Sequence, residues 1–400
     1  MPEVIVVGAG PVGLLMAGEL RRHGVDVELL EQRTEPSPGT RAIGVHPPVL
    51  TALEGSGITE GLLEHAVRVG HGQARSRGRL LGTVRFDRLS ARFPFVATLP
   101  QAATEAVLAR SAPEPVRGVR VTGLASVGDA VQLSTDAGER HAPLVVLAGG
   151  ARSRHLVHPG LQAHTYPDRY LMTDAEVPDD DSRATAVVHL TEAGVLESFP
   201  LPGGRRRFVA WDPPGAALDA PARRGRMEQA LADRGAATGR RAAVRETTGD
   251  DITVRETTVG EVTGFAVRRL VAPTMRRGRV FIVGDAAHEV SPIGGQGMNL
   301  GLLDAVALAP LLAAWLHTGV CAEADLRRWE LSRMRSARRA ALLAGVNLRL
   351  GRPATPARDA LRRCGLRAML SPGARELFTR AYAMGFDAGA RTWSRPPGHG

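Results

Sequence analysis

The segment Val4-Ile5-Val6-Val7-Gly8-Ala9-Gly10-Pro11-Val12-Gly13 joins an apolar run to a glycine-rich turn near the start of the chain. The apolar run predicts a buried strand, and the helical pattern from Leu14 to His23 predicts a helix directly after the turn. Glycines at this spacing allow a tight turn, close approach of the backbone to a pyrophosphate, and tight packing of the helix on the strand. The segment therefore predicts the nucleotide-binding strand, turn and helix of an α/β fold.

A second predicted strand, Val25 to Leu30, ends in an acidic residue, Glu31. A carboxylate at this place accepts hydrogen bonds from the ribose of an adenosine. A glycine-rich turn by itself also occurs in α/β proteins that bind no nucleotide. Here the strand, the helix and the acidic residue stand in register, and together they favour a bound dinucleotide.

A second glycine-rich stretch lies far along the chain, where Gly284-Asp285-Ala286-Ala287-His288 leads into the run from Pro292 to Asn299. A buried strand is predicted over residues 279–283, so Asp285 stands at a strand end and can reach a ribose or ribityl hydroxyl. The glycines of the run offer open backbone N–H groups at a helix start, which suits the pyrimidine edge of a reduced, anionic flavin. One motif alone indicates a dinucleotide, and the pair predicts FAD.

The composition is that of a globular protein. Hydrophobic residues make up 44% and charged residues 23% of the 400 residues, a length that fits two joined lobes. The best apolar run, Ala305 to Leu316, is interrupted by Pro310 and is shorter than the ~20 residues that span a bilayer. The start of the chain has no basic segment of a signal peptide, and Cys321 and Cys364 suit neither a metal site nor a disulfide scaffold. We therefore expect a cytoplasmic protein without membrane insertion and without a bound metal.

The basic residues are biased, because all 51 lysine-plus-arginine positions are arginine, and the net charge is +10. Without lysine, no Schiff base, P-loop or catalytic amine can operate. The arginines are scattered and aromatic residues make up only 4%, so no platform for stacking nucleic acid bases is evident. We expect arginine to balance an anionic cofactor or substrate, and the run Arg205-Arg206-Arg207 after a glycine turn to form an exposed hairpin end.

The two motifs, with Asp304 and with Trp329 and Arg333 further on, resemble the class A flavoprotein monooxygenases of the para-hydroxybenzoate hydroxylase type. The resemblance extends over nearly the whole chain, and Tyr166 to Asp174 is similar to the family's crossover into its substrate domain. It implies FAD, reduction by NADPH or NADH, reaction with O2 to a flavin C(4a)-hydroperoxide, and transfer of one oxygen atom to the substrate. The residues that the motifs and the resemblance together assign to FAD are Gly8, Gly10, Gly13, Glu31, Arg41, Gln101, Asp285, Gly294, Gly295, Gly297, Met298 and Asn299.

The fold class that follows is α/β, with a Rossmann-type FAD-binding domain, an inserted mixed β-sheet substrate domain and C-terminal helices. Turn-rich segments with alternating apolar residues predict the strands of the inserted sheet. The expected parts are the FAD-binding domain at 1–69, 98–165 and 276–318, substrate-domain strands at 70–97, the substrate domain at 166–275, C-terminal helices at 319–391 and a disordered tail at 392–400.

One segment departs from the family pattern Asp-Gly-x-x-Ser-x-x-Arg. Here the segment reads Gly149-Gly150-Ala151-Arg152-Ser153-Arg154-His155-Leu156, so the acidic residue and the last arginine are absent. In the family this segment helps to bind both flavin and nicotinamide. Arg152 and Arg154 are the candidates here for holding the pyrophosphate of NADPH, and a separate flavin reductase is the alternative source of electrons.

The predicted function is insertion of one oxygen atom from O2 into an aromatic or polycyclic small molecule, as a hydroxylation in secondary metabolism such as antibiotic biosynthesis. Pro292 and Gly295 are expected to surround the reactive part of the flavin, and no side chain is assigned as a base. An epoxidase or Baeyer–Villiger monooxygenase on the same scaffold is one alternative. A flavin-dependent oxidase or dehydratase that does not use NAD(P)H directly is another.

Two further classes fit less well. A flavin halogenase resembles this group but depends on a lysine, which the chain lacks. A nucleotide-binding module without enzyme activity would require that the second motif be accidental. The chemistry is therefore expected to belong to the flavin, with protein groups that place the substrate and exclude water.

Overall fold

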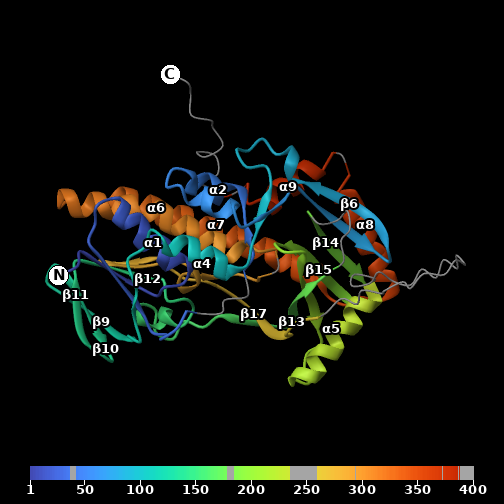
Figure 1. Cartoon of the computed structure of the whole chain (residues 1–400), viewed down its shortest axis with the longest axis horizontal. Coiled ribbons are helices and arrows are strands. Elements are labelled where there is room, and N and C mark those ends of the chain that lie inside the picture. The colour runs from blue at the N-terminus through green and yellow to red at the C-terminus, as the bar shows by residue number, and fades with distance from the viewer. Residues whose placement is uncertain are drawn as a thin grey trace, which may run out of the picture.

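The computed structural model describes residues 1–36, 42–177, 184–234, 259–292, 294–371, 373–385 and 387. Arg41 and the expected tail at 392–400 lie outside the described residues. Figure 1 shows an elongated molecule with the N-terminus at one end and the C-terminal helix α8 (Pro356–Met369) at the other.

A six-stranded sheet forms the centre of the nucleotide domain. Its strand order is β18-β19-β12-β1-β2-β8, and all neighbours except the antiparallel β18 pair in parallel. The central strands are buried on both faces, which explains their unbroken apolar sequences. The strands are β1 (Val4–Val7), β2 (Val27–Glu31), β8 (Val116–Arg117), β12 (Leu144–Leu147), β18 (Arg276–Arg277) and β19 (Val280–Ile282).

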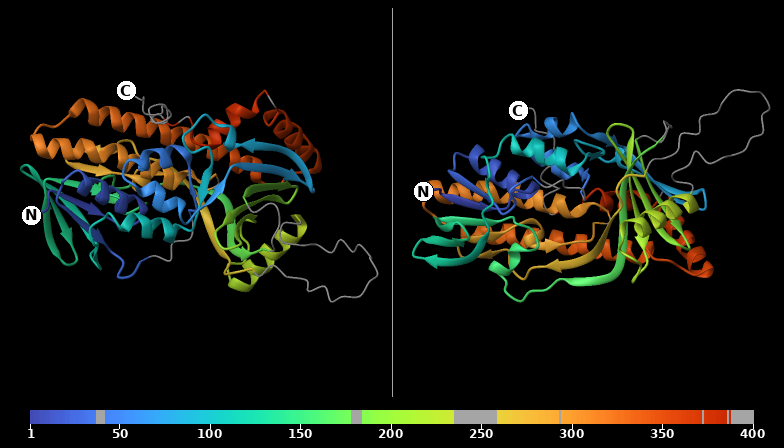
Figure 2. Two further views of the ribbon diagram at one scale, coloured as in Figure 1. Left: turned by 45° about the horizontal axis from the view of Figure 1, so that its top comes forward. Right: turned by 60° about the horizontal axis from the view of Figure 1, so that its bottom comes forward.

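Helices from distant parts of the chain cover this sheet. Helix α1 (Pro11–Arg22) packs against both α4 (Gln101–Ala109) and α6 (Gln296–Thr318), and α6 packs against the long α7 (Glu323–Gly351). Figure 2 shows α6 and α7 running alongside each other. Two short helices, α2 (Pro47–Glu54) and α3 (Ile58–Leu63), pack beside α6 and α4 respectively.

Helix α6 is the one described helix that is long and apolar enough to cross a membrane by length and composition alone. Of its most apolar window, 61% is buried inside the protein. Its contacts with α1, α2 and α7 account for this burial, as in the core helix of a globular domain.

The inserted sheet has eight strands in the order β20-β17-β13-β16-β15-β14-β5-β6. Only β5 and β14 pair in parallel, so the sheet is mixed, as predicted. Strand β20 comes from the segment that we assigned to the nucleotide domain, so the sheet extends past the expected boundary at residue 275. The strands are β5 (His71–Ser76), β6 (Arg79–Arg85), β13 (His164–Glu176), β14 (Thr185–Thr191), β15 (Gly194–Leu201), β16 (Arg205–Asp212), β17 (Thr263–Val271) and β20 (His288–Glu289).

Alternation along these strands divides the inserted sheet between two apolar cores. Leu196 of β15 joins Met227 of helix α5 (Ala220–Arg234) on one face. The preceding residue, Val195, joins Leu348 of α7 and Leu366 of α8 on the other face. Successive side chains of a strand point to opposite faces, so β15 contributes to both cores.

The expected exposure of the arginine run is wrong for two of its three residues. Arg205 is exposed, but Arg206 and Arg207 are only 6% and 3% exposed. The Arg207 guanidinium pairs with Asp174 of β13 at 2.6 Å, and Arg206 donates to Ser198 and to the Thr185 carbonyl. These partners satisfy the buried charges, and they lie too far along the chain to be read from a local pattern.

Two three-stranded antiparallel sheets complete the fold. One, β9 (Val121–Val127), β10 (Ala130–Thr135) and β11 (Gly138–Ala142), lies at the N-terminal end of the molecule in Figure 1. The other has the order β3-β7-β4 and joins β3 (Gly44–Val45), β7 (Val96–Thr98) and β4 (Val67–Val69). Strands β4 and β7 contact β15, so this sheet lies between the two lobes.

Candidate flavin site

The first glycine motif follows β1 and has no room for side chains at two positions. Gly8 has a φ of 106°, and a Cβ there would lie 2.6 Å from the Cα of Gly149. A Cβ at Gly13 would lie 1.7 Å from the Gly8 carbonyl oxygen. Both glycines are therefore required by the packing of the turn against its own helix and against the end of β12.

Gly10 differs, because a Cβ there would meet no atom within 4 Å. Gly10 is the N-cap of α1, and no side chain caps this helix end. The first N–H groups of a helix have no partner within the helix, and they carry partial positive charge. Open space beside uncapped N–H groups is the environment that a pyrophosphate requires.

Glu31 ends β2 beside this turn and is 4% exposed. Its carboxylate accepts the Ala9 N–H at 2.8 Å and three N–H groups of Arg33 at 2.9 to 3.2 Å. Burial raises the pKa of Glu31, but the hydrogen bonds from Arg33 and Ala9 outweigh it, and the net pKa lies below the ordinary value. Glu31 is thus an ionised acceptor, and a ribose hydroxyl would have to replace one of the Arg33 bonds.

Gln101 opens α4, as predicted, and contacts Ala42, which follows Arg41 in the sequence. Its Oε1 accepts the Ala42 N–H at 3.3 Å, and its Nε2 donates to Glu105 at 2.9 Å. The structure therefore brings Gln101 and the neighbour of Arg41 together. The expected contacts of Gln101 and Arg41 with FAD stay predictions.

The second glycine motif lies directly against the first. Gly284, with a φ of 62°, faces Val12 of α1, and a Cβ at Gly301 of α6 would lie 2.6 Å from the Val12 Cγ2. Small residues at 284 and 301 thus allow α1 and α6 to approach each other. The two motifs, more than 270 positions apart in the chain, form one site.

A buried polar network fixes the start of α6 to α7. Asp304 accepts the Gly284 N–H at 3.0 Å, lies 2.7 Å from His288 Nε2, and pairs with Arg333 at 2.8 Å. Arg333 also pairs with Asp387 at 2.9 Å. Burial raises the pKa of Asp304, but His288 and Arg333 outweigh it and the net pKa is lowered. His288 therefore makes a structural hydrogen bond with Asp304 at the entry to α6.

The glycine run at the start of α6 is held in a left-handed conformation. Gly294 and Gly295 have φ values of 95° and 67°, which favour glycine. The Asn299 side chain donates to the Gly44 and Gly295 carbonyls, at 2.8 and 2.9 Å, and accepts the His46 N–H at 2.8 Å. Asn299 is fully buried, so its side chain holds the run in place. Backbone groups of the run are therefore the ones expected to contact the cofactor.

The remaining predicted residues of this motif differ in exposure. Asp285 and Pro292 are exposed, whereas Gly297 and Met298 are half-buried. The Pro292 carbonyl accepts the Gly295 N–H at 2.9 Å, which closes the turn before α6. The expected contacts of Asp285, Pro292 and the glycines with FAD stay predictions.

His46 is a residue of this site that the sequence pattern did not identify. It is the N-cap of α2, and a Cβ at Gly295 would lie 3.7 Å from its Nε2. Burial lowers the pKa of His46 to about 4, against a smaller effect of a hydrogen bond with the Gly294 backbone. The imidazole is therefore neutral at physiological pH, and its buried Nδ1 has no hydrogen-bond partner among the described residues.

A second unpredicted group lies between the inserted sheet and the C-terminal helices, and we call Tyr170, Glu197, Asn347 and Tyr382 the interlayer cluster. Tyr382 of α9 (Arg375–Tyr382) donates to Asn347 Oδ1 on α7 at 2.5 Å, and Asn347 Nδ2 would lie 3.4 Å from a Cβ at Gly294. Burial raises the pKa of Glu197 on β15 to about 8. The charge of Glu197 contributes to the raised pKa values of both tyrosines, after burial as the main cause.

The segment 149–156, which departs from the family pattern, contains two arginines with different surroundings. Arg154 is 4% exposed, donates to the Ala286 and Asp285 carbonyls and pairs with Glu289 at 2.7 Å. Its guanidinium ties this segment to the second motif, which favours a structural role over nicotinamide binding. Arg152 is exposed, and no bond of its guanidinium is described, so it stays the candidate for an anionic cofactor.

The described residues fit FAD. The α1 N-terminus offers open N–H groups at Gly10, Glu31 offers an ionised acceptor at the end of β2, and the α6 N-terminus offers glycine backbone. Among the buried atoms without described partners is Nδ1 of His46, whose ring lies beside Gly295 at the α6 N-terminus. A buried polar atom without a partner is costly, and a ligand at this place can satisfy it.

Comparisons with known proteins identify the family and the fold. A model of the family described as FAD binding domain matches residues 1–342. The chain is 35% identical to 6-methylpretetramide 4-monooxygenase of Streptomyces rimosus, over 78% of this chain and 56% of that protein. It is also 35% identical to a rifampicin monooxygenase of Streptomyces venezuelae, over 78% of this chain and 64% of that protein. The chain thus spans about three fifths of the length of these relatives.

Among solved structures, p-nitrophenol 4-monooxygenase of Pseudomonas putida superposes with a TM-score of 0.82 at 25% identity. The match covers 96% of this chain and 98% of that chain, so both lobes and the C-terminal helices are shared. The para-hydroxybenzoate hydroxylase-like fold predicted from the two motifs is thereby confirmed. The chain belongs to the FAD binding domain family, among the class A flavoprotein monooxygenases.

Proposed function

We propose that the protein is an FAD-dependent monooxygenase that inserts one atom of O2 into an aromatic or polycyclic small molecule. The observation that carries the proposal is the meeting of the α6 N-terminus with the interlayer cluster, through the approach of Gly294 to Asn347. This arrangement puts a buried carboxyl and two phenols of the inserted sheet and C-terminal helices on the side of the expected flavin edge. The named relatives act on tetracycline-type, rifamycin-type and nitrophenol compounds, which supports an aromatic or polycyclic substrate.

The protein's own groups would bind the cofactor and exclude water. FAD, when bound, supplies the activation of O2, which no side chain can provide. The α1 N-terminus binds the pyrophosphate, and the α6 N-terminus stabilises negative charge on the pyrimidine edge. Pro292 and Gly295 line the reacting side of the ring, and neutral His46 offers a hydrogen bond without adding positive charge.

Glu197 is our candidate for the phenolic proton of the substrate. Its pKa of about 8 lies closer to that of a phenol, about 10, than an ordinary carboxyl does. Proton exchange is most efficient between groups of similar pKa. Glu197 lies two residues from Val195 on β15, so it points to the face of the sheet that packs on α7. A hydroxylase needs such a group, whereas an epoxidase does not.

We place the enzyme in the cytoplasm and assign NADPH or NADH as the reductant, with Arg152 as the candidate contact. Cys321 and Cys364 are free thiols, as a reducing compartment favours. The test is anaerobic stopped-flow absorbance of the FAD-loaded protein mixed with NADPH, with and without aromatic candidates. Rapid bleaching of the oxidised flavin band, slowed in Arg152→Ala but not in Arg120→Ala, would support direct reduction.

A flavin protein that does not use NAD(P)H directly is the second candidate. Gly149 and Leu156 replace the two charged residues of the family pattern, and Arg154 is engaged in structural bonds. If the flavin stays oxidised with NADPH but is bleached by an added flavin reductase, the monooxygenase proposal holds with an external electron source. If substrate alone bleaches it under argon, the protein is an oxidase and the monooxygenase proposal fails.

A further inference from the structure

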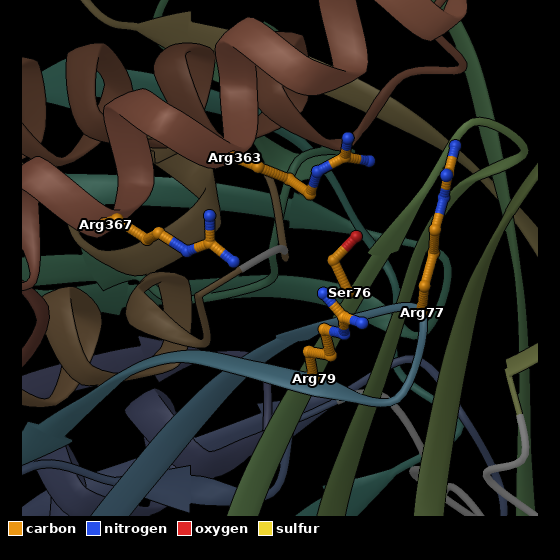
Figure 3. A pocket seen from close by; sticks show the side chains of 5 residues that line it. All are labelled: Ser76, Arg77, Arg79, Arg363 and Arg367. Atoms are coloured by element: carbon orange, nitrogen blue, oxygen red, sulfur yellow. The ribbon is translucent and has the colours of Figure 1, made fainter.

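A second cavity lies far from the flavin site, between the β5–β6 hairpin and helix α8 (Figure 3). It has a volume of about 430 Å³, within the usual range for small-molecule sites. Its lining residues are Ser76, Arg77, Arg79, Arg363 and Arg367. Four of these five side chains are guanidinium groups, so the cavity is suited to an anion.

The hairpin turn sets the positions of three lining residues. Ser76 and Arg79 are paired across the hairpin, and Arg77 and Gly78 form the two-residue turn between them. Both turn residues have positive φ, 50° and 76°, as in the tight turns that match strand twist. In Figure 3, Ser76 and Arg79 lie on the side of the hairpin that faces Arg363 and Arg367 of α8.

The arginines of this cavity are only partly balanced by acids. Arg77 pairs with Glu192, and Arg363 pairs with Asp359, which Arg362 also contacts. No ion pair or hydrogen bond of the Arg79 or Arg367 guanidinium is described within the part of the chain that the structure covers. The cavity therefore has an excess of positive charge.

Ser76 provides an independent indication of a ligand. It is 2% exposed, and its Oγ has no hydrogen-bond partner among the described residues. A buried hydroxyl without a partner costs about 1–3 kcal/mol, so native proteins rarely leave one unsatisfied. Figure 3 shows the Ser76 hydroxyl directed toward α8, between Arg79 and Arg363.

We propose that this cavity binds the phosphate group of a phosphorylated small molecule. Guanidinium groups match phosphate oxygens with paired N–H donors, and the Ser76 hydroxyl would add a further donor. The unbalanced Arg79 and Arg367 would neutralise a dianion. A carboxylate has fewer oxygens and a single charge, so it would use fewer of these donors.

The proposed phosphate site is separate from the flavin site. Strand β20 belongs to the second glycine motif and forms one edge of the eight-stranded sheet, whereas β6 forms the opposite edge. Seven strand-to-strand steps at ~4.8 Å put these edges on the order of 30 Å apart. None of the residues expected to bind FAD lines this cavity, so the proposal does not depend on the proposed function.

The test is calorimetric titration of the FAD-loaded protein with inorganic pyrophosphate at constant ionic strength. FAD fills the pyrophosphate site at α1, so a saturable heat reports a second site. We expect Arg79→Gln and Arg367→Gln each to weaken binding about tenfold or more, since a charged hydrogen bond contributes about 1.5–3 kcal/mol and ~1.4 kcal/mol is tenfold. The exposed Arg358, on α8 but outside the cavity, provides the matched control Arg358→Gln, which should bind as the wild type does.

Ser76→Ala separates a ligand role from a structural one. Because the hydroxyl has no described partner, its removal should leave the melting temperature of the ligand-free site unchanged or raise it, while pyrophosphate binding weakens. Adenosine 2′,5′-bisphosphate is titrated in parallel, and tighter binding than that of pyrophosphate identifies a nucleotide as the source of the phosphate. The absence of saturable binding, or an equal loss in Arg358→Gln, would overturn the proposal. Flavin content and flavin reduction of Arg79→Gln serve as separate readouts of the proposed function.

Discussion

Gly10 and Gly13 belong to one motif, but packing requires a glycine only at position 13. Ala at 13 would place a Cβ 1.7 Å from the Gly8 carbonyl oxygen, whereas Ala at 10 would meet no atom within 4 Å. We expect Gly13→Ala to destabilise the fold by several kcal/mol, at or above the ~1–3 kcal/mol of ordinary overpacking. Gly10→Ala should leave the free energy of unfolding of the flavin-free protein nearly unchanged but weaken FAD binding at least tenfold. Urea unfolding of the flavin-free proteins and fluorescence titration with FAD measure the two effects, and equal unfolding midpoints for both variants would contradict the assignment.

Glu197 should make stability depend on pH in a direction opposite to that of most carboxylates. Between its ordinary pKa of 4.5 and its folded value of about 8, the folded chain holds a proton that the unfolded chain has lost. Raising the pH through this window therefore lowers the free energy of unfolding, by up to ~1.4 kcal/mol per pH unit. Urea unfolding from pH 5 to 8 should show this decline in the wild type and a weaker one in Glu197→Gln. The exposed Glu176 supplies the control Glu176→Gln, which should follow the wild type.

Local pattern identified residues whose role depends on their sequence neighbours, and it missed those whose partners are distant. Gly13 packs against the Gly8 carbonyl within a turn of six residues, so its spacing from Gly8 was enough to indicate this turn. Glu197 stands in an ordinary alternating strand, and its raised pKa comes from burial by elements that are distant in the sequence. The predicted exposure of Arg206 and Arg207 was wrong for the same reason, because the groups that pair with them are on other strands.

At the scale of elements, α6 and α7 are joined by a single buried cation between two buried carboxylates. Arg333 is 2% exposed and pairs with Asp304 and Asp387. Arg333→Met would remove the cation that two buried carboxylates share, and we expect a loss of ~3–5 kcal/mol in the free energy of unfolding. Chemical denaturation checks this, with Arg338→Met at an exposed position of α7 as the control. Adding Asp387→Asn to Arg333→Met should recover part of the loss, and a further equal loss would show that the charges do not interact.

Strands and helices with an unbroken apolar sequence or a clear periodicity could be predicted from the sequence. How these elements pair in the sheets could be predicted only in part. The runs of β1 and β12 indicated a parallel sheet because only doubly buried strands lack polar residues. The strands of the inserted sheet were recognisable as a group, but the pairing of β14 with β5 depends on tertiary packing. The two-residue β20 is too short to give any periodic signal, so no strand was expected there.

For the molecule as a whole, FAD should act as a stabilising ligand. Its expected site combines residues from the start of the chain, from α4 and from the α6 N-terminus, so unfolding of the nucleotide domain would destroy the site. A ligand at a hundredfold excess over its dissociation constant adds ~2.7 kcal/mol to the free energy of unfolding. The melting temperature should therefore rise steadily with FAD concentration. Riboflavin, which lacks the pyrophosphate and adenosine, is the control, and an equal rise with riboflavin would argue against the α1 site.

The parallel pairing of β5 with β14 has a consequence for synthesis of the protein in the cell. His71 pairs with Thr185, which the ribosome adds 114 residues later. At about 5–20 residues per second, the β5–β6 hairpin of the nascent chain waits on the order of 6–20 s for its neighbour. During translation that hairpin presents an unpaired edge, which is a template for aggregation. Co-translational chaperones that shield this edge should therefore raise the yield of soluble protein more than any change to the nucleotide domain.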